Sequence, residues 1–187
     1  MTYRKQLVII PGIGDDHWAY HVGVRRFRAA GFAGHIHVFN WGQPNPDEYD
    51  ARMIDFDRFI TSLPDIPTYL IGVSAGGPVA INAFAAMPDK IAAVATLASP
   101  LSAFRGPVNP LLAVAIDRVE TNLRHMDSAL KARIISIHGS ADAIVPTRLS
   151  RHAGIQHATI PTFLHPVTIL FGLTIYSSSI RHFFKQR

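Results

Sequence analysis

Short apolar runs rich in β-branched residues alternate with longer amphipathic segments along the whole chain. Six of the short runs are typical of buried strands, because each is brief and bounded by turn-forming residues. They cover residues 6–10, 35–40, 68–73, 92–97, 134–138 and 158–160. Apolar positions recur at helical spacing over residues 17–30, 47–63, 76–87, 110–130, 147–153 and 166–184. This alternation predicts an α/β protein with a parallel sheet and helices on both faces.

The loops that follow the predicted strands belong to one rim of such a sheet. The proline-rich segments 43–46 and 100–110 are loops of this rim. In open α/β sheets, ligands bind outside the carboxyl ends of the strands. Residue types that take part in catalysis or ligand binding are therefore of most interest in these loops.

Composition narrows the class of protein. The length of 187 residues predicts a single domain, residues 1–187, with a full hydrophobic core. The absence of cysteine excludes disulfides, thiolate nucleophiles and zinc ribbons. A hydrophobic content of 48% with only 17% charged residues excludes a disordered chain.

The formal net charge of +5 raises the question of a nucleic-acid partner. The basic residues are spread from Arg4 to Arg187, whereas a nucleic-acid footprint concentrates charge on one face. We therefore expect a solvated basic surface and no nucleic acid. Residues 7–11 are too short for the apolar core of an export signal, and the apolar stretch 167–176 is too short to span a membrane. These features predict a cytoplasmic protein without stable membrane insertion.

A Gly-x-Ser-x-Gly motif, residues 72–76, joins the third predicted strand to a helix. A side chain on so sharp a turn has a strained backbone, and the residues two positions away must be small. Gly72 and Gly76 meet this requirement. Ser74 would then project at a helix N-terminus, where free N–H groups favour an oxyanion. A glycine-rich turn without chemistry has the same sequence, so the motif needs support from elsewhere.

Residues 139–146, Gly-Ser-Ala-Asp-Ala-Ile-Val-Pro, follow the fifth predicted strand. With the serine motif, they resemble the α/β-hydrolase superfamily, whose acid follows the penultimate strand in a Gly-x-x-Asp-x-Ile/Val-Val-Pro context. The resemblance implies that Asp142 is the acid of a catalytic triad. It also implies a three-layer α/β-hydrolase fold with a minimal, mostly parallel sheet of about six strands and little or no cap. An Asx turn or a helix cap near Thr147 is the structural alternative for Asp142.

The histidine of this superfamily follows the last strand, and His165 occupies that place. The loop before it lacks the glycine that members commonly carry there. His157, at the start of the last strand, and His152, on the preceding helical pattern, are the alternatives. The order Ser74, Asp142, His165 is the serine, acid, histidine order of the fold.

The loop after the first strand, residues 11–18, reads Pro-Gly-Ile-Gly-Asp-Asp-His-Trp. A dinucleotide fingerprint needs a third glycine where His17 stands and an acid after the second strand, so we exclude that function. In the hydrolase superfamily the equivalent loop reads His-Gly-x-Gly or Pro-Gly-x-Gly. The resemblance implies that the main-chain N–H groups of Ile13 and Ala75 form the oxyanion hole.

Four apolar residues are candidates for substrate binding. Trp18 and Trp41 follow strand ends closely enough to line the rim, although buried aromatic residues more often belong to the core. Leu111 and Leu112 lie in the segment 100–130, where the superfamily inserts its cap. This segment is long enough only for one helix and a loop, so it is a candidate minimal lid. A helix packed on the sheet would have the same composition.

Two pairs of histidines have ligand spacing. His35 and His37 share a strand face, and His17 and His21 share a helical face. No carboxylate joins either pair in a recognised zinc pattern, so we expect neither a metal nor a cofactor.

Together these residues predict a cofactor-free serine hydrolase that resembles compact esterase and lipase members of the superfamily. Its partner would be a small-molecule ester or acyl substrate, cleaved through an acyl-enzyme intermediate. A thioesterase or an amidase would use the same triad, because pocket shape selects the leaving group and the acyl chain. A non-catalytic binding or regulatory protein is the alternative from another class, since fold does not fix function. The lack of a large cap predicts an open site.

Overall fold

The computed structural model describes residues 3–14, 18–42 and 45–187. The described residues form a six-stranded sheet in the order β2-β1-β3-β4-β5-β6, and every neighbouring pair is parallel. The strands are β1 (Lys5–Ile10), β2 (Phe32–Ile36), β3 (Thr68–Val73), β4 (Ile91–Leu97), β5 (Ile134–Gly139) and β6 (Gln156–Ile160). The predicted α/β fold with a minimal parallel sheet is confirmed.

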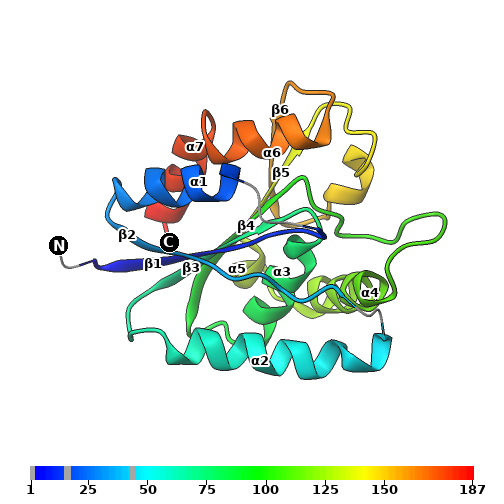
Figure 1. Cartoon of the computed structure of the whole chain (residues 1–187), viewed down its shortest axis with the longest axis horizontal. Coiled ribbons are helices and arrows are strands. Elements are labelled where there is room, and N and C mark those ends of the chain that lie inside the picture. Colours follow the sequence, from blue (N-terminus) through cyan, green and yellow to red (C-terminus); the bar gives the residue numbers. More distant parts are fainter. Residues whose placement is uncertain (1–2, 15–17, 43–44) are drawn as a thin grey trace.

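Helices cover both faces of the sheet and make a three-layer molecule (Figure 1). One face carries α1 (Trp18–Arg28), α6 (His165–Leu173) and α7 (Ser177–Lys185). The other carries α2 (Tyr49–Ser62), α3 (Gly76–Ala86) and α4 (Pro110–His125). The remaining connections contain α5 (Ser128–Lys131) and two 3-10 helices, η1 (Pro46–Glu48) and η2 (Thr147–Ser150). No helix within the described ranges is both long enough and apolar enough to cross a membrane.

The interior strand β1 is apolar from Leu7 to Ile10 because it is buried on both faces. Leu7 and Ile9 pack in the core beneath α1, α6 and α7, whereas Val8 and Ile10 pack in the core beneath α2, α3 and α4. All four side chains are fully buried. Because successive side chains of a strand point to opposite faces, a strand covered on both sides needs an unbroken apolar run.

The strand order creates a switch point between β1 and β3. The helix that follows β1 lies on one face of the sheet, and the helix that follows β3 lies on the other (Figure 1). The two loops therefore diverge at the carboxyl ends of the strands and leave a crevice, which is where open α/β sheets bind ligands. Ile13 lies in the loop after β1, and Ser74 lies in the turn after β3.

The predicted second strand, residues 35–40, is shifted to Phe32–Ile36. Its apolar pattern continues beyond the strand because Phe39 is buried and packs on Trp41, with ring centroids 4.8 Å apart. In this stretch the apolar pattern therefore indicates buried side chains and not pairing with a neighbouring strand. The predicted helix 17–30 is observed from Trp18, and His17 lies outside the described residues.

Three predicted helices are also divided or shortened. The segment 110–130 breaks at Met126, which is extended, and Asp127 then caps the separate helix α5 by accepting a hydrogen bond from Leu130 N. The segment 166–184 divides into α6 and α7 at Thr174–Tyr176. In place of the helix predicted at 147–153, the chain forms only the four-residue η2.

Candidate active site

The turn between β3 and α3 holds Ser74 in a backbone conformation that side chains rarely adopt, with φ of 50°. A Cβ atom on Gly72 would lie 2.4 Å from the carbonyl oxygen of Gly76, and one on Gly76 would lie 2.1 Å from that of Ile10. Both positions therefore require glycine, because neighbouring backbone atoms leave no room for a Cβ atom. The Ser74 N–H donates to Leu97 O of β4 at 2.9 Å, which fixes the turn against the neighbouring strand. The strained turn expected from the sequence is present.

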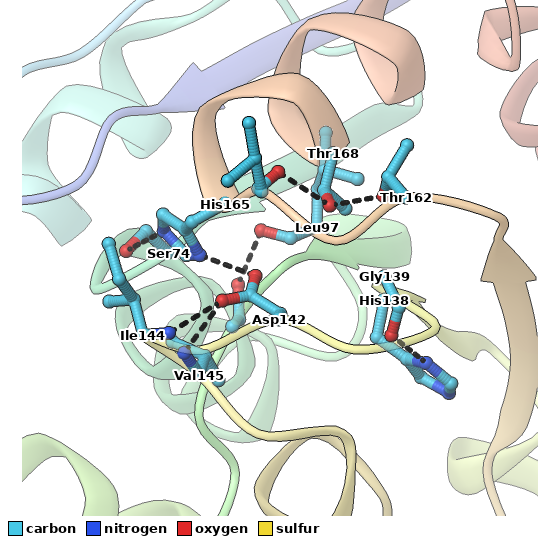
Figure 2. A network of polar contacts seen from close by, with 12 residues as sticks. Ser74, Leu97, His138, Gly139, Asp142, Ile144, Val145, Thr162, His165 and Thr168 are labelled. Atoms are coloured by element: carbon cyan, nitrogen blue, oxygen red, sulfur yellow. Dashed lines mark hydrogen bonds and ion pairs between the residues drawn. The ribbon is translucent and has the colours of Figure 1, made fainter.

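Ser74, His165 and Asp142 form a continuous line of hydrogen bonds (Figure 2). His165 Nε2 lies 3.0 Å from Ser74 Oγ, and His165 Nδ1 lies 2.6 Å from Asp142 Oδ2. Only 8% of His165 and 4% of Asp142 are exposed, whereas Ser74 is partly open to the pocket described below. With Nδ1–H donated to the carboxylate, Nε2 is left as the acceptor for the serine hydroxyl.

The second oxygen of Asp142 is held by its own loop. Oδ1 accepts hydrogen bonds from the main-chain N–H groups of Ile144 and Val145, each at 2.9 Å. The side chain thus makes the Asx turn considered as its structural alternative and still presents Oδ2 to His165. The two expectations for Asp142 are compatible, because the turn orients the carboxylate toward the imidazole.

The loop that carries Asp142 is joined to the loop that carries His165. Thr162 O accepts from Ala141 N at 3.3 Å and from Ser140 Oγ at 3.1 Å. The Thr162 hydroxyl lies 2.6 Å from Thr168 Oγ1 in the first turns of α6, and both threonines are buried (Figure 2). A Cβ on Gly139 would lie 2.6 Å from Thr168 Oγ1, so the end of β5 needs a glycine here.

The two alternative histidines lie elsewhere. His157 Nε2 is 3.0 Å from His152 O, and the His157 ring packs near His138, with centroids 6.4 Å apart. Neither His152 nor His157 makes a hydrogen bond with Ser74 or Asp142. Of the three histidines considered, only His165 joins the other two residues.

A pocket of about 530 Å³ opens over Ser74 and His165. Of the residues expected at the site, Ile13, Ala75, Trp18 and Leu112 line it. Among the described residues, none accepts a hydrogen bond from the main-chain N–H of Ile13 or of Ala75.

Trp41 and Leu111 do not line this pocket, in contrast to the expectation that they bind substrate. Trp41 is 7% exposed and Leu111 is fully buried, and both belong to the core beneath α2, α3 and α4. Leu111 points into that core because α4 packs against α3. Within the segment 100–130, the helix α4 therefore packs mainly in the core, and Leu112 is the one predicted residue of the segment that lines the pocket.

Sequence reasoning missed several apolar residues of the pocket: Pro100, Phe104, Ile144, Val145, Val167 and Leu170. Ile144 and Val145 follow Asp142 directly, and Val167 and Leu170 lie three residues apart after His165. The helical spacing of Val167 and Leu170 after His165 could have predicted them, because residues three apart lie on the same face of a helix. The place of Phe104 depends on a loop conformation that no local pattern specifies.

A larger and more open depression of about 840 Å³ lies at the opposite, amino ends of the strands. Its most buried charge, Arg133, already donates to the carbonyl oxygens of Pro88 and Ala92, at 2.7 and 2.8 Å. Burial lowers the pKa of this guanidinium from its ordinary value. The depression therefore offers no group comparable to the hydrogen-bonded line at Ser74.

Comparisons with known proteins give the family and the fold of this chain. A profile of the alpha/beta hydrolase family matches residues 7–174. No curated protein sequence matches the chain. Among solved structures, a monoacylglycerol lipase of Paleococcus ferrophilus superposes with a TM-score of 0.71 at 16% identity, over 97% of this chain and 95% of that one.

Two further solved structures are similar in fold. The thioesterase domain from the curacin biosynthetic pathway has a TM-score of 0.73 at 13% identity, over 95% of this chain and 91% of that one. The ydeN gene product of B. subtilis has a TM-score of 0.68 at 18% identity, over 97% of this chain and 99% of that one. These identities indicate a shared fold. The match of the family profile over most of the chain shows that this protein belongs to the alpha/beta hydrolase family.

Proposed function

We propose that this chain is a serine hydrolase that cleaves carboxylic esters through an acyl-enzyme intermediate. The observation that carries the proposal is the line of hydrogen bonds from Ser74 Oγ through His165 to Asp142, because Ser74 and His165 also line a largely apolar pocket. A serine hydroxyl is a weak nucleophile until an adjacent base accepts its proton. His165 Nε2 lies at the right distance for this role.

In the proposed reaction, Ser74 Oγ attacks the ester carbonyl while its proton passes to His165 Nε2. Asp142 Oδ2 accepts the Nδ1–H and stabilises the imidazolium that forms. The tetrahedral intermediate collapses, and His165 returns the proton to the departing alcohol. Water then attacks the acyl-enzyme with His165 again as base, which releases the carboxylic acid and restores Ser74.

The main-chain N–H groups of Ile13 and Ala75 would bind the oxyanion of the tetrahedral intermediate. Both residues line the pocket, and Ala75 directly precedes α3 at the end where a helix carries partial positive charge. Such donors stabilise charge that develops only in the transition state, and one of them typically contributes about 10²–10³ in rate.

Similarity in fold to lipase and thioesterase structures supports acyl transfer, and esters, thioesters and amides are the three substrate classes that the same triad would cleave. The non-catalytic alternative offers no reason for an imidazole held by both Ser74 and Asp142. Active-site labelling with a fluorophosphonate, which reacts with activated serines, separates catalysis from binding alone. We expect stoichiometric labelling of the wild-type protein and no labelling of Ser74→Ala.

Ser178→Ala is the matched control, because Ser178 is exposed on α7, away from the pocket. This variant should be labelled like the wild type. Equal labelling of the wild type and Ser74→Ala would overturn the proposed function. Hydrolysis rates for an oxyester, a thioester and an amide with the same acyl group then assign the leaving-group class.

A further inference from the structure

Large apolar side chains are exposed mainly around the mouth of the pocket. Of the eight that are exposed in the described parts of the chain, five belong to this region, and we call them the apolar rim: Ile13, Trp18, Ile144, Phe163 and Leu164. Ile13, Trp18 and Ile144 line the pocket itself. Phe163 and Leu164 directly precede His165.

The apolar rim comes from separate segments of the chain: the loop after β1, the start of α1, the loop after β5 and the loop after β6. Its members are 46% to 70% exposed, so they contribute little to the core. A single exposed apolar residue is ordinary, whereas a gathering of such residues from several loops marks an interaction surface. The rim therefore has the composition of an interaction surface.

The apolar rim is continuous with an apolar interior. Among the residues that the structure describes, every side chain that lines the pocket is apolar apart from Ser74, His165 and the indole of Trp18, and only His165 is ionisable. A charged or strongly hydrated group would lose its water here without finding a partner. An acyl chain, by contrast, could pass from the rim to Ser74 and remain in apolar contact throughout.

Two exposed cationic side chains follow pocket residues closely in the sequence. Arg105 is exposed and directly follows the pocket residue Phe104, and Arg148 is exposed three residues after the pocket residue Val145. Within the described ranges, neither guanidinium forms an ion pair. The nearby carboxylate of Glu120 accepts a hydrogen bond from Ala103 N. Apolar side chains beside unpaired cations complement an anionic lipid surface, with its apolar interior and charged head groups.

We propose that the apolar rim docks this protein on a lipid–water surface, and that its substrate is an ester lipid held in that surface. This inference rests on the proposed function, because it names the substrate class for Ser74. The acyl chain would leave the lipid layer through the rim and lie in the pocket, with its carbonyl at Ser74. Hydrolysis consumes one water and yields a fatty acid and the alcohol part of the lipid.

Docking can be measured without catalysis in Ser74→Ala, using mixed vesicles of phosphatidylcholine and phosphatidylglycerol. The chain has two tryptophans, and they are well placed for this test. Trp18 belongs to the rim and is 62% exposed, whereas Trp41 is 7% exposed in the core. We expect a blue shift of tryptophan emission on adding vesicles, because Trp18 enters an apolar layer, and co-sedimentation of the protein with the vesicles.

A pair of double substitutions tests whether the rim is responsible. Phe163→Ser with Leu164→Ser, added to Ser74→Ala, removes two rim residues that do not line the pocket. We expect vesicle partitioning to weaken by about tenfold, since each lost apolar group reduces interfacial burial. The matched control is Ile54→Ser with Ile175→Ser, which removes two residues of similar exposure outside the rim. Thermal unfolding shows that both double variants are folded.

Three results would overturn the inference: no binding to vesicles, equal loss of binding in the rim and control variants, or a stable dimer that the rim substitutions dissociate. The last result, read from sedimentation velocity, would assign the rim to a second copy of the chain. Failure of docking is distinct from failure of the proposed function, because fluorophosphonate labelling of the wild type needs no vesicle. A protein that the fluorophosphonate labels but that does not bind vesicles would be a hydrolase of esters dissolved in water.

Discussion

Gly76 has no room for a side chain, because an added Cβ would lie 2.1 Å from the carbonyl oxygen of Ile10 and 2.7 Å from that of Pro11. Both contacts are with backbone, which cannot swing aside. We expect Gly76→Ala to lower the free energy of unfolding by about 3 kcal/mol, as strained overpacking does. Urea unfolding checks this value.

Gly42→Ala is the control for that substitution. Among the described residues, the one atom within 4 Å of a Cβ on Gly42 would be Asn40 Oδ1, at 3.2 Å, at the end of a side chain that can move. Its free energy of unfolding should stay within about 1 kcal/mol of the wild type. Similar losses in the two variants would show that the packing between β1 and the Ser74 turn is not tight.

Asp142→Asn separates the orienting role of the carboxylate from its structural role. The amide oxygen can still accept from Ile144 N and Val145 N, so the loop should keep its shape. The amide NH₂ then faces His165 Nδ1, which must accept, and the proton moves to Nε2, where it blocks transfer from Ser74. We expect kcat for ester hydrolysis to fall by about 10⁴ with little loss of stability. A fall of less than tenfold would contradict the proposed role.

At the scale of elements, two loops are held together by Thr162. Its carbonyl binds the loop after β5, and its hydroxyl contacts Thr168 of α6. Thr162→Val keeps the size of the side chain and removes the hydroxyl. We expect a loss of about 1 kcal/mol in the free energy of unfolding and a fall of up to about 10²-fold in kcat with KM unchanged, because His165 would shift relative to Asp142.

Thr162→Ser restores the hydroxyl and serves as the rescue variant. It should recover most of the kcat lost in Thr162→Val, whereas a role in packing alone would make the smaller serine worse than valine. Measuring kcat and KM on a short-chain ester distinguishes these results. Full activity of Thr162→Val would show that the hydrogen bonds to the Thr162 carbonyl are enough to align the two loops.

Periodicity predicted the strands that are buried on both faces, because burial is the physical cause of an apolar run. Periodicity gave wrong element boundaries where residues are buried without belonging to a strand or helix. Phe39 and Trp41 are buried outside β2, so the pattern extended that strand too far. The breaks inside the predicted long helices depend on caps such as Asp127, which accepts from Leu130 N, and a local cap is a weaker signal than a long pattern.

The serine turn, together with the resemblance to the α/β-hydrolase superfamily, was enough to propose Ser74, Asp142 and His165, and each of them follows its own strand. The pocket walls were harder to predict. Leu111 and Leu112 are neighbours with the same side chain and both pack in the core, yet only Leu112 also lines the pocket. That choice depends on how α4 is rotated against α3, which is a tertiary property.

At the scale of the whole molecule, burial couples stability to pH. It lowers the pKa of His35, His37 and His138 below the ordinary value of 6.5. Unfolding returns each imidazole to that value, so the unfolded chain binds more protons than the folded one as pH falls below 6.5. The stabilisation is therefore fully present above this pH and is lost on acidification toward the folded pKa values.

We expect the free energy of unfolding, measured in urea, to fall between pH 7.5 and pH 5.5. His37→Phe should reduce the fall, because His37 packs against Phe56 and Phe59, with ring centroids 4.8 and 4.5 Å away, and phenylalanine keeps this packing without a proton site. An unchanged pH dependence in this variant would show that His37 does not contribute to it.

The dispersal of the site along the chain also affects when it forms during synthesis. The turn at Ser74 needs only strands β1, β3 and β4, which are neighbours in the sheet and leave the ribosome before β5 and β6. His165 lies beyond the last strand and is the final member of the hydrogen-bonded line to be made. A growing chain can thus fold its central strands while the serine still lacks its base. Ester cleavage would begin only once β6 has joined the edge of the sheet.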